Sequence, residues 1–155
     1  MLPIEDFGEI VKIRYLKAAL EHVDGINNFL KTFNRSDTYP IERLNDVILY
    51  EKEAVYVAEV CGQIVGVVIL NPSTHELSLI VVDSSCRRNG IGKSLLTLAE
   101  KRASYFKIEY LKHHTIVEYL KFFVKMGYSQ EGNSVLVLKS GKKKEGVRLI
   151  KRVSV

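Results

Sequence analysis

The spacing of apolar residues in the first fifty positions predicts one strand and two helices. Residues Val11 to Leu16 mix apolar and basic side chains, which favours a short strand. Apolar residues then recur at helical spacing, which predicts an amphipathic helix through Leu16, Leu20, Val23, Ile26, Leu30 and Phe33. A polar loop follows, and Pro40 is placed to open a second, shorter helix from Ile41 to Leu49.

Apolar runs in the middle of the chain predict three strands followed by a helix. Ala54 to Val60 and Gln63 to Leu70 read as strands, joined by the two-residue hairpin turn Cys61-Gly62. Glu76 to Asp83 is apolar enough for a strand buried on both faces. Beyond a glycine-rich turn, one helical face is formed by Gly92, Leu95, Leu96, Ala99 and Ala103.

The last third of the chain predicts a strand, a helix and two more strands. Lys107 to Leu111 reads as a short strand, with His113 and His114 in the loop after it as surface histidines. Thr115 to Glu118 has the pattern of a capping box, and Gly127 is placed to end the helix that follows. A lysine-rich turn separates the two last strands, predicted at Ser134 to Leu138 and Val147 to Val153.

Length and composition fit one globular domain, which we expect to span residues 1–155. The hydrophobic fraction of 46% and the charged fraction of 26% are typical of such domains. No apolar run has the length of a membrane span, and the N-terminus has no signal-peptide pattern. The two cysteines make neither a disulfide framework nor a zinc site, so we expect no metal and a cytoplasmic protein, or a nuclear one in a eukaryote.

The net charge of +5 is concentrated in two segments rather than spread along the chain. One cluster surrounds residues 87–102, where an anionic cofactor would explain it. The other lies at the C-terminus and favours a solvated loop and strand face. Aromatic residues do not alternate with its lysines and arginines, which argues against a nucleic-acid platform.

The segment from Arg87 to Lys93 carries the clearest chemistry, because it combines glycines and basic residues between a predicted strand and a predicted helix. Gly90 and Gly92 lack a Cβ atom, so the backbone can approach a ligand closely. The first N–H groups of a helix have no partner within the helix and, with the helix dipole, form an anion site. The segment therefore predicts a cradle for phosphate.

Three kinds of glycine-rich phosphate loop could account for this segment. A P-loop fails because Arg87 stands where its first glycine belongs, and a dinucleotide fingerprint fails because Asn89 replaces a glycine. The pattern Arg/Gln-x-x-Gly-x-Gly/Ala fits at every fixed position. It resembles the acetyl-CoA signature of the GNAT superfamily of N-acetyltransferases, which implies cofactor contacts from Arg87, Arg88, Asn89, Gly90, Ile91, Gly92 and Lys93.

The order of predicted elements is also similar to the GNAT fold across nearly the whole chain. The resemblance implies an α+β, three-layer architecture with a mixed, splayed sheet of about seven strands flanked by about four helices. Acetyl-CoA would lie in the gap between the fourth and fifth strands, against the backbone of Ile80, Val81 and Val82 and beside Phe123. The implied partners are acetyl-CoA and an amine acceptor, with no membrane, for a monomer or a homodimer.

Glu76 is the candidate general base, since an ammonium ion must lose a proton before it can attack a thioester. It stands eleven residues before Arg87, an offset similar to that of the base in the histone-acetyltransferase branch. Residues Phe122 to Ser129 resemble the same branch, which favours a protein lysine as acceptor. A small amine or a protein N-terminus stays open, as does a solvated strand-end role for Glu76.

The sequence departs from the family pattern at the group that would protonate the leaving thiolate, because Phe123 stands where many GNAT members have tyrosine. Tyr119 or Tyr128 could replace that tyrosine, and Tyr119 is the first choice because it lies one helical turn earlier. Ile116 also replaces an asparagine that many members carry. These two departures keep open a second hypothesis, a catalytically degenerate module that binds acyl-CoA.

Overall fold

Seven strands form one mixed sheet in the computed structural model, which describes residues 12–32, 41–87, 89–137 and 140–154. The spatial order is β1-β2-β3-β4-β5-β7-β6. Every neighbouring pair is antiparallel except β4 and β5, which run parallel. The strands are β1 Arg14–Lys17, β2 Ala54–Val60, β3 Gln63–Asn71, β4 Glu76–Val82, β5 Tyr110–Ile116, β6 Ser129–Val137 and β7 Lys143–Arg152.

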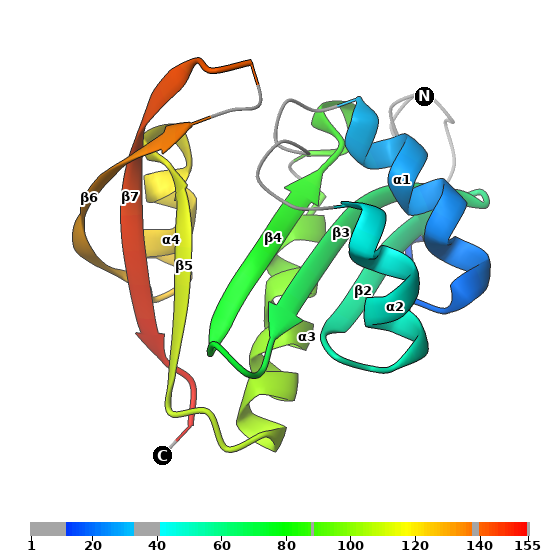
Figure 1. The fold of residues 1–155 in the computed structure, drawn as a ribbon, viewed down its shortest axis with the longest axis horizontal. Coiled ribbons are helices and arrows are strands. Elements are labelled where there is room, and N and C mark those ends of the chain that lie inside the picture. The colour runs from blue at the N-terminus through cyan, green and yellow to red at the C-terminus, as the bar shows by residue number, and fades with distance from the viewer. Residues whose placement is uncertain (1–11, 33–40, 88, 138–139, 155) are drawn as a thin grey trace.

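Helices cover both faces of this sheet, so the chain folds in three layers (Figure 1). The helices are α1 Val23–Lys31, α2 Leu44–Leu49, α3 Ile91–Tyr105 and α4 Leu120–Lys125. Single 3-10 turns precede them or lead toward them: η2 Leu20–His22, η4 Ile41–Arg43, η5 Ser84–Cys86 and η6 Val117–Tyr119. The predicted α+β architecture with about seven strands and four helices is confirmed.

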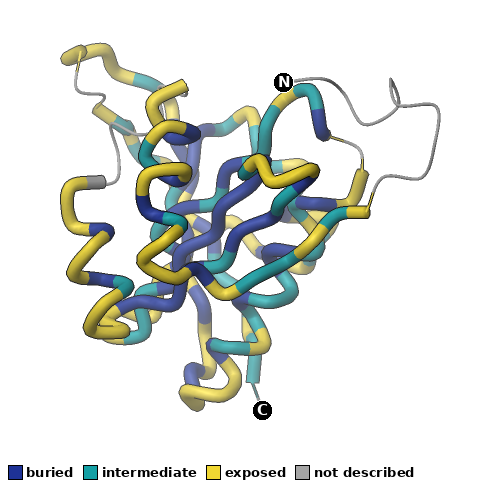
Figure 2. The backbone as a smooth tube through the Cα atoms, turned by 90° about the vertical axis from the view of Figure 1, so that its right-hand side faces the viewer, coloured by how far each residue is buried: buried dark blue, intermediate teal, exposed yellow. Residues whose placement is uncertain are grey.

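Two apolar layers separate the helices from the sheet. On one side, Ile26, Leu30 and Val47 of α1 and α2 pack against alternate residues of β2, β3 and β4. On the other side, the buried face of α3 and Phe123 of α4 pack against residues of the opposite alternation. Figure 2 shows the buried strands in dark blue behind helices whose outer turns are exposed. This alternation is the reason for the period-two pattern of the strands.

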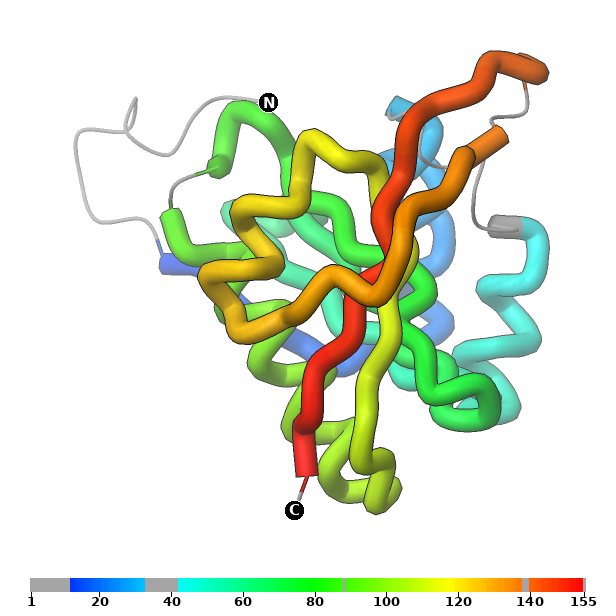
Figure 3. Tube along the Cα trace, turned by 90° about the vertical axis from the view of Figure 1, so that its left-hand side faces the viewer, coloured from blue at the N-terminus to red at the C-terminus, as the bar shows by residue number. Residues whose placement is uncertain are grey.

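The sheet opens between β4 and β5. These strands pair only at Glu76 with Lys112 and at Leu77 with His113, and beyond this point they diverge (Figure 1). Strands β5, β7 and β6 continue as a separate arm, which Figure 3 shows with β7 between the other two. The predicted gap between the fourth and fifth strands is therefore present, at the carboxyl end of β4.

A β-bulge in β4 decides which residues face this gap. Leu70 of β3 pairs with Leu77 while Ile69 pairs with Leu79, so Ser78 is an extra residue. Leu79 therefore packs on the α1 side, whereas Ile80 packs on the α3 side. The sequence predicted that this strand is buried on both faces. In the structure, Ile80 and Val82 are only half-buried, because they face the opening.

Three boundaries in the last third of the chain differ from the predictions. The fifth strand begins at Tyr110 and ends at Ile116, because α3 runs to Tyr105 and the chain then turns through Lys107 at a φ of 61°. Thr115 is fully buried in β5, so the predicted capping box does not exist. The final strands also start earlier, at Ser129 and Lys143.

The first helical region differs as well. The predicted continuous helix from Leu16 is a strand that ends at Lys17, followed by the turn η2 and by α1 from Val23. The hairpin between β2 and β3 is confirmed at Cys61-Gly62, whose φ angles of 51° and 79° fit a two-residue turn. Pro40 and Phe33 lie outside the described residues.

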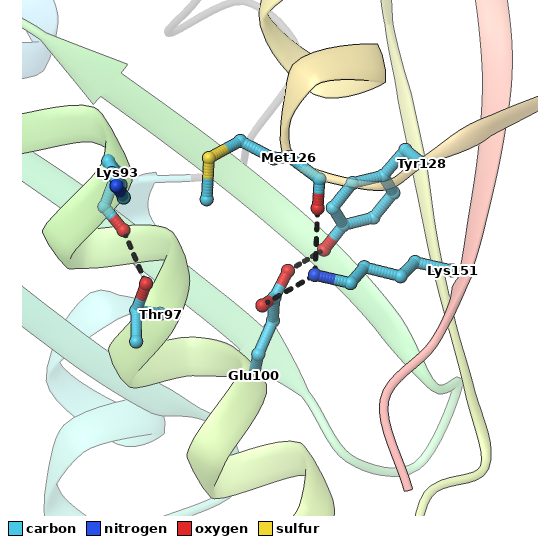
Figure 4. A network of polar contacts seen from close by, with 6 residues as sticks. All are labelled: Lys93, Thr97, Glu100, Met126, Tyr128 and Lys151. Atoms are coloured by element: carbon cyan, nitrogen blue, oxygen red, sulfur yellow. Dashed lines mark hydrogen bonds and ion pairs between the residues drawn. The ribbon is translucent and has the colours of Figure 1, made fainter.

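A partly buried polar network ties the arm to α3 on one side of the opening (Figure 4). The Tyr128 hydroxyl donates to Oε2 of Glu100 at 2.8 Å, and Nζ of Lys151 lies 3.1 Å from Oε1 of the same carboxylate. Lys151 also donates to the Met126 carbonyl oxygen at 2.7 Å. Because α3, the turn after α4 and β7 each contribute a group, the network fixes the arm relative to the helix.

Replacing Tyr128 with phenylalanine should lower the free energy of unfolding at pH 8 by about 1.5–3 kcal/mol, the usual contribution of a hydrogen bond to a charged group. Burial and the neighbouring Glu100 raise the pKa of Tyr128 above its ordinary value of 10.0. Above pH 10, Tyr128 ionises in the unfolded protein but stays protonated in the folded one, which lowers the free energy of unfolding of the wild type. Tyr128→Phe has no such group, so the difference in unfolding free energy between the two proteins shrinks. Urea unfolding of both proteins at pH 8 and pH 11 measures this. An equal difference in the free energy of unfolding at pH 8 and at pH 11 would contradict this prediction.

Candidate active site

A cavity of about 400 Å³ lies where β4 and β5 diverge. Residues from four parts of the chain line it. They are Ile80, Val81 and Val82 of β4, Arg87 and Gly90 to Lys93 of the glycine-rich turn, Thr115 of β5, and Tyr119, Phe122 and Phe123 from η6 and α4. The structure thus brings most of the sequence-predicted cofactor residues together around one opening.

The mouth of the cavity is formed by the first turn of α3. The first intrahelical bond runs from Ser94 N–H to the Gly90 carbonyl oxygen at 3.0 Å. The N–H groups of Ile91, Gly92 and Lys93 therefore precede the helical hydrogen-bond ladder. All three residues line the cavity, and the positive end of the helix dipole lies there. The predicted order of strand, turn and helix start is confirmed.

The two glycines of the cradle have different structural roles. Gly90 has a φ of 74°, a left-handed conformation that side chains rarely adopt, and it ends the turn just before α3. A Cβ atom on Gly92 would lie 3.3 Å from Cζ of Phe122 and 3.8 Å from Cγ2 of Val82. Gly90 thus allows the turn, and Gly92 leaves space between α3, α4 and β4.

Polar side chains hold the connection between β4 and α3 in shape. Oδ1 of Asp83 accepts hydrogen bonds from the N–H and hydroxyl of Ser85 at 2.8 and 2.6 Å. Farther along, the Asn89 amide donates to the carbonyl oxygens of Cys86 and Arg87 at 3.1 and 3.3 Å. The Asn89 side chain is used in the turn itself and does not line the cavity.

Basic residues at the mouth complement the backbone cradle. Arg87 is exposed, and its Nη2 donates to the Tyr119 hydroxyl at 3.3 Å while the guanidinium lies 5.7 Å from the ring centre. Lys93 is also exposed on the first turn of α3. Arg88 lies outside the described residues. An anion at the helix start would therefore meet two cationic side chains as well as N–H groups.

The inner part of the cavity is apolar. Phe123 is only 2% exposed and packs against Phe122, His113 and Tyr128, with ring centres 5.1, 4.9 and 5.3 Å away. Opposite these rings, β4 beyond Leu77 has no pairing with β5, so its backbone groups on that edge face the opening. The arrangement suits a flexible chain that carries both methylene and amide groups.

Glu76 lies at the closed end of the split, away from the cavity lining. It is exposed at the start of β4 and pairs with Lys112. Because the next residue, Leu77, packs on the α3 side, the side chain of Glu76 belongs to the opposite face of the sheet. A base at this position would approach the gap from the face opposite the cavity.

The two adjacent histidines belong to β5 and not to a surface loop, which corrects the prediction. His113 is buried, and its Nδ1 bonds to the Leu77 carbonyl oxygen at 2.7 Å, closing the end of the split. His114 faces the other way, where Nε2 contacts the Ser134 hydroxyl of β6. Burial and Arg148 lower the pKa of His114, and Glu76 opposes them.

Sequence reasoning did not identify some of the site residues, because it placed the end of the fifth strand too early. Thr115 was assigned to a helix cap, whereas its strand position puts it in the cavity wall. Likewise, His114 was assigned to the surface because a two-residue polar pair interrupts the apolar pattern. Alternation through Leu111, His113 and Thr115, all buried, is the signal that would have placed them.

Among the described residues, no group of three or more histidine, cysteine or acidic side chains could hold a metal ion. Cys61 is a free, exposed cysteine and Cys86 a free, buried one. No helix in the described part of the chain is long and apolar enough to cross a membrane.

Comparison with known protein families identifies one family. A family model described as an acetyltransferase (GNAT) domain matches residues 17–141. A search of curated protein sequences gives no match.

Solved structures share the fold at low sequence identity. An acetyltransferase of the GNAT family from Streptococcus pneumoniae is 18% identical over 91% of this chain and 99% of its own, with a TM-score of 0.75. The ribosomal-protein-alanine N-acetyltransferase from Brucella melitensis is 20% identical over 90% and 99%, with a TM-score of 0.74. A GNAT acetyltransferase from Elizabethkingia anophelis, with acetyl-CoA bound, is 18% identical over 90% and 97%, with a TM-score of 0.66. The chain belongs to the GNAT family of acetyltransferases.

Proposed function

We propose that this N-acetyltransferase uses acetyl-CoA, bound in the cavity between β4 and β5. The observation that carries the proposal is the cradle at the start of α3, which opens onto an apolar slot beside an unpaired strand edge. The N–H groups of residues 91–93, with Arg87 and Lys93, would hold the phosphates. The backbone of Ile80, Val81 and Val82 would bond the amides of the pantetheine arm, and Phe123 would pack against it.

The acceptor in this proposal is a primary amine that attacks the thioester directly. The cavity is covered by α3 and α4 on one face of the sheet, so the amine reaches the thioester from the other face, through the split. Glu76 is exposed on that face and is the proposed general base. Its carboxylate attracts the ammonium form of the acceptor and takes a proton from it.

We favour a protein lysine over other amines, on the resemblance around Glu76 and Phe122 to Ser129. A lysine side chain is long enough to reach into the split while the rest of its protein stays outside. Small amines and protein N-termini are the alternatives. The Brucella neighbour, named for a ribosomal-protein alanine, is similar at the level of fold.

The acceptor class is tested by incubating the protein and acetyl-CoA with peptides that carry one free amine. One peptide has a free lysine and a blocked N-terminus, the second has a free N-terminus and no lysine, and spermidine represents small amines. Mass spectrometry identifies the acetylated nitrogen. We expect acetylation of the lysine peptide, and preference for either of the others would overturn the lysine assignment while leaving acetyl transfer intact.

Tyr119 is the proposed proton donor to the departing thiolate. Tyr119 lines the cavity, and its hydroxyl accepts a hydrogen bond from Arg87. We expect Tyr119→Phe to lower kcat by about tenfold, less than the roughly 100-fold or more that is usual for general acid catalysis, because a CoA thiolate leaves readily. A rise in the Kd for acetyl-CoA with unchanged kcat would instead assign Tyr119 to the orientation of Arg87. Steady-state kinetics and calorimetric titration separate the two results.

A second candidate function is a degenerate module that binds acyl-CoA without turnover. It is favoured by Phe123, which has no proton to donate, and by Ile116, which ends β5 as a buried apolar residue. Saturable binding of acetyl-CoA, without release of CoA in the presence of any amine, would support this candidate over the enzyme.

The cellular setting is also part of the proposal. Free cysteines at positions 61 and 86 fit a reducing compartment, which favours the cytoplasm, or the nucleus in a eukaryote. A monomer or a homodimer is the expected state.

A further inference from the structure

We propose that His114 is a second proton acceptor of the acetyl transfer, which takes the remaining proton from the attacking nitrogen after the tetrahedral intermediate has formed. This inference rests on the proposed function and adds a residue to it. It starts from the position of His114 at the split between β4 and β5.

His114 is the first residue of β5 beyond the last β4–β5 pair, Leu77 with His113. The following residue, Thr115, lines the cavity. Leu111, His113 and Thr115 face α3 and α4, so His114 projects from the opposite face. Its position in β5 therefore lies beside the opening, on the face from which an acceptor would enter, and its ring reaches over Gly146 of β7 to Ser134 of β6.

The imidazole is held in one place by the arm of the sheet. Nε2 contacts the Ser134 hydroxyl, and a Cβ atom on Gly146 would lie 3.2 Å from that nitrogen and 3.1 Å from Oγ of Ser134. The missing side chain at Gly146 thus leaves the space that the pair occupies. His114 is half-buried, and among the residues that the structure describes none is shown to form a hydrogen bond with its Nδ1.

The charged groups around His114 keep it able to accept a proton. On the same face, β4 contributes Glu76, β7 contributes Arg148, and β5 itself contributes Lys112. Burial, as the largest influence, and Arg148, as the second, lower the pKa of His114 below 6.5, whereas Glu76 acts to raise it. The ring is therefore neutral at neutral pH.

The chemistry requires two proton acceptors when the acceptor enters as an ammonium ion. Glu76 takes the first proton, and the neutral amine then forms a C–N bond to the thioester carbon, which leaves a positive nitrogen and a negative oxygen. His114 takes the second proton through Nδ1. The C–S bond then breaks, the oxygen returns to a carbonyl, and the products are the amide and a CoA thiolate, which takes its proton from Tyr119. The N-protonated intermediate is far more acidic than an ammonium ion, so a weakly basic imidazole suffices.

The test compares His114→Gln with Glu76→Gln on two kinds of acceptor. One is an alkylamine that is protonated at the assay pH, and the other is trifluoroethylamine, which is already neutral. We expect Glu76→Gln to be rescued by the neutral amine, because no first proton has to be removed. His114→Gln should lose about 100-fold in kcat with both amines, because the second proton remains. Calorimetry should give an unchanged Kd for acetyl-CoA.

Two further measurements guard against a merely structural effect. The wild-type kcat should decrease as the pH drops below 6.5, and this acid limb of the pH profile should be absent in His114→Gln. Ser134→Ala should lower kcat and retain the acid limb. His75→Asn, in the β3–β4 turn next to Glu76, serves as the control and should match the wild type, since asparagine tolerates its φ of 59°.

A His114→Gln enzyme within about threefold of wild type, or one with the acid limb intact, would overturn the role of His114 and leave the proposed function standing. Rescue of His114→Gln by the neutral amine would also overturn it, because the residue would then act on the first proton. If the wild type itself transfers acetyl to no amine, the proposed function fails, and the role of His114 fails with it.

Discussion

Replacing Gly92 with valine should weaken acetyl-CoA binding by about 100-fold, equal to about 2.7 kcal/mol and to the loss of one hydrogen bond to a charged group. A Cβ atom added at this position would lie 3.3 Å from Phe122, and the valine methyl groups would extend farther into the space that Gly92 leaves open. The phosphates would then be held away from the N–H groups of the first turn of α3. Calorimetric titration with acetyl-CoA measures the change in Kd.

The fold should survive this substitution, because valine is a better helix residue than glycine. Urea unfolding of Gly92→Val should give a free energy within about 1 kcal/mol of wild type. Gly132→Val is the matched control, since a Cβ atom at Gly132 meets nothing within 4 Å and the residue lies in β6, away from the cavity. Unchanged acetyl-CoA affinity in a folded Gly92→Val protein would place the cofactor somewhere other than this cradle.

Glu76→Gln should lower kcat by about 100-fold or more at neutral pH, the usual contribution of a general base. The substitution keeps the size of the side chain and removes its ability to accept a proton. Since a protonated acceptor depends most on the base, the loss should be greatest at low pH and shrink as the amine deprotonates by itself. Steady-state rates of acetyl transfer between pH 6 and pH 10 measure this change.

Acetyl-CoA affinity should be unaffected in Glu76→Gln, because Glu76 does not line the cavity. Glu109→Gln is the control, since Glu109 is an exposed glutamate whose ion pair with Arg152, at 3.5 Å, lies on the surface. A pH profile of Glu76→Gln that follows the wild type at every pH would show that Glu76 is a solvated strand-end residue.

The cradle could be predicted from the sequence because its determinants are local. Strand, turn and helix follow each other directly in the chain, and Gly90 and Gly92 impose their backbone requirements within a few residues. The hairpin at Cys61-Gly62 was predictable for the same reason. In such segments the geometry is set by neighbouring residues, and distant contacts add little.

The opposite face of the split could not be predicted in this way. The contact between His114 and Ser134 joins β5 to β6, with Gly146 of β7 between them, so it depends on strand order. The polar residues of β5 also hid its period of two, and Thr115 to Glu118 imitated a helix cap. Likewise, the bulge at Ser78, which turns Ile80 toward the cavity, depends on pairing with β3.

In the proposed reaction, the opening between β4 and β5 transfers an acetyl group from CoA to an amine. The most direct measurement follows CoA release from acetyl-CoA in the presence of the lysine peptide, with mass spectrometry of the peptide product. We expect CoA release to saturate with both substrates and to equal the amount of amide formed. Tight binding of acetyl-CoA without amide formation, for the lysine peptide and every other amine tried, would contradict it.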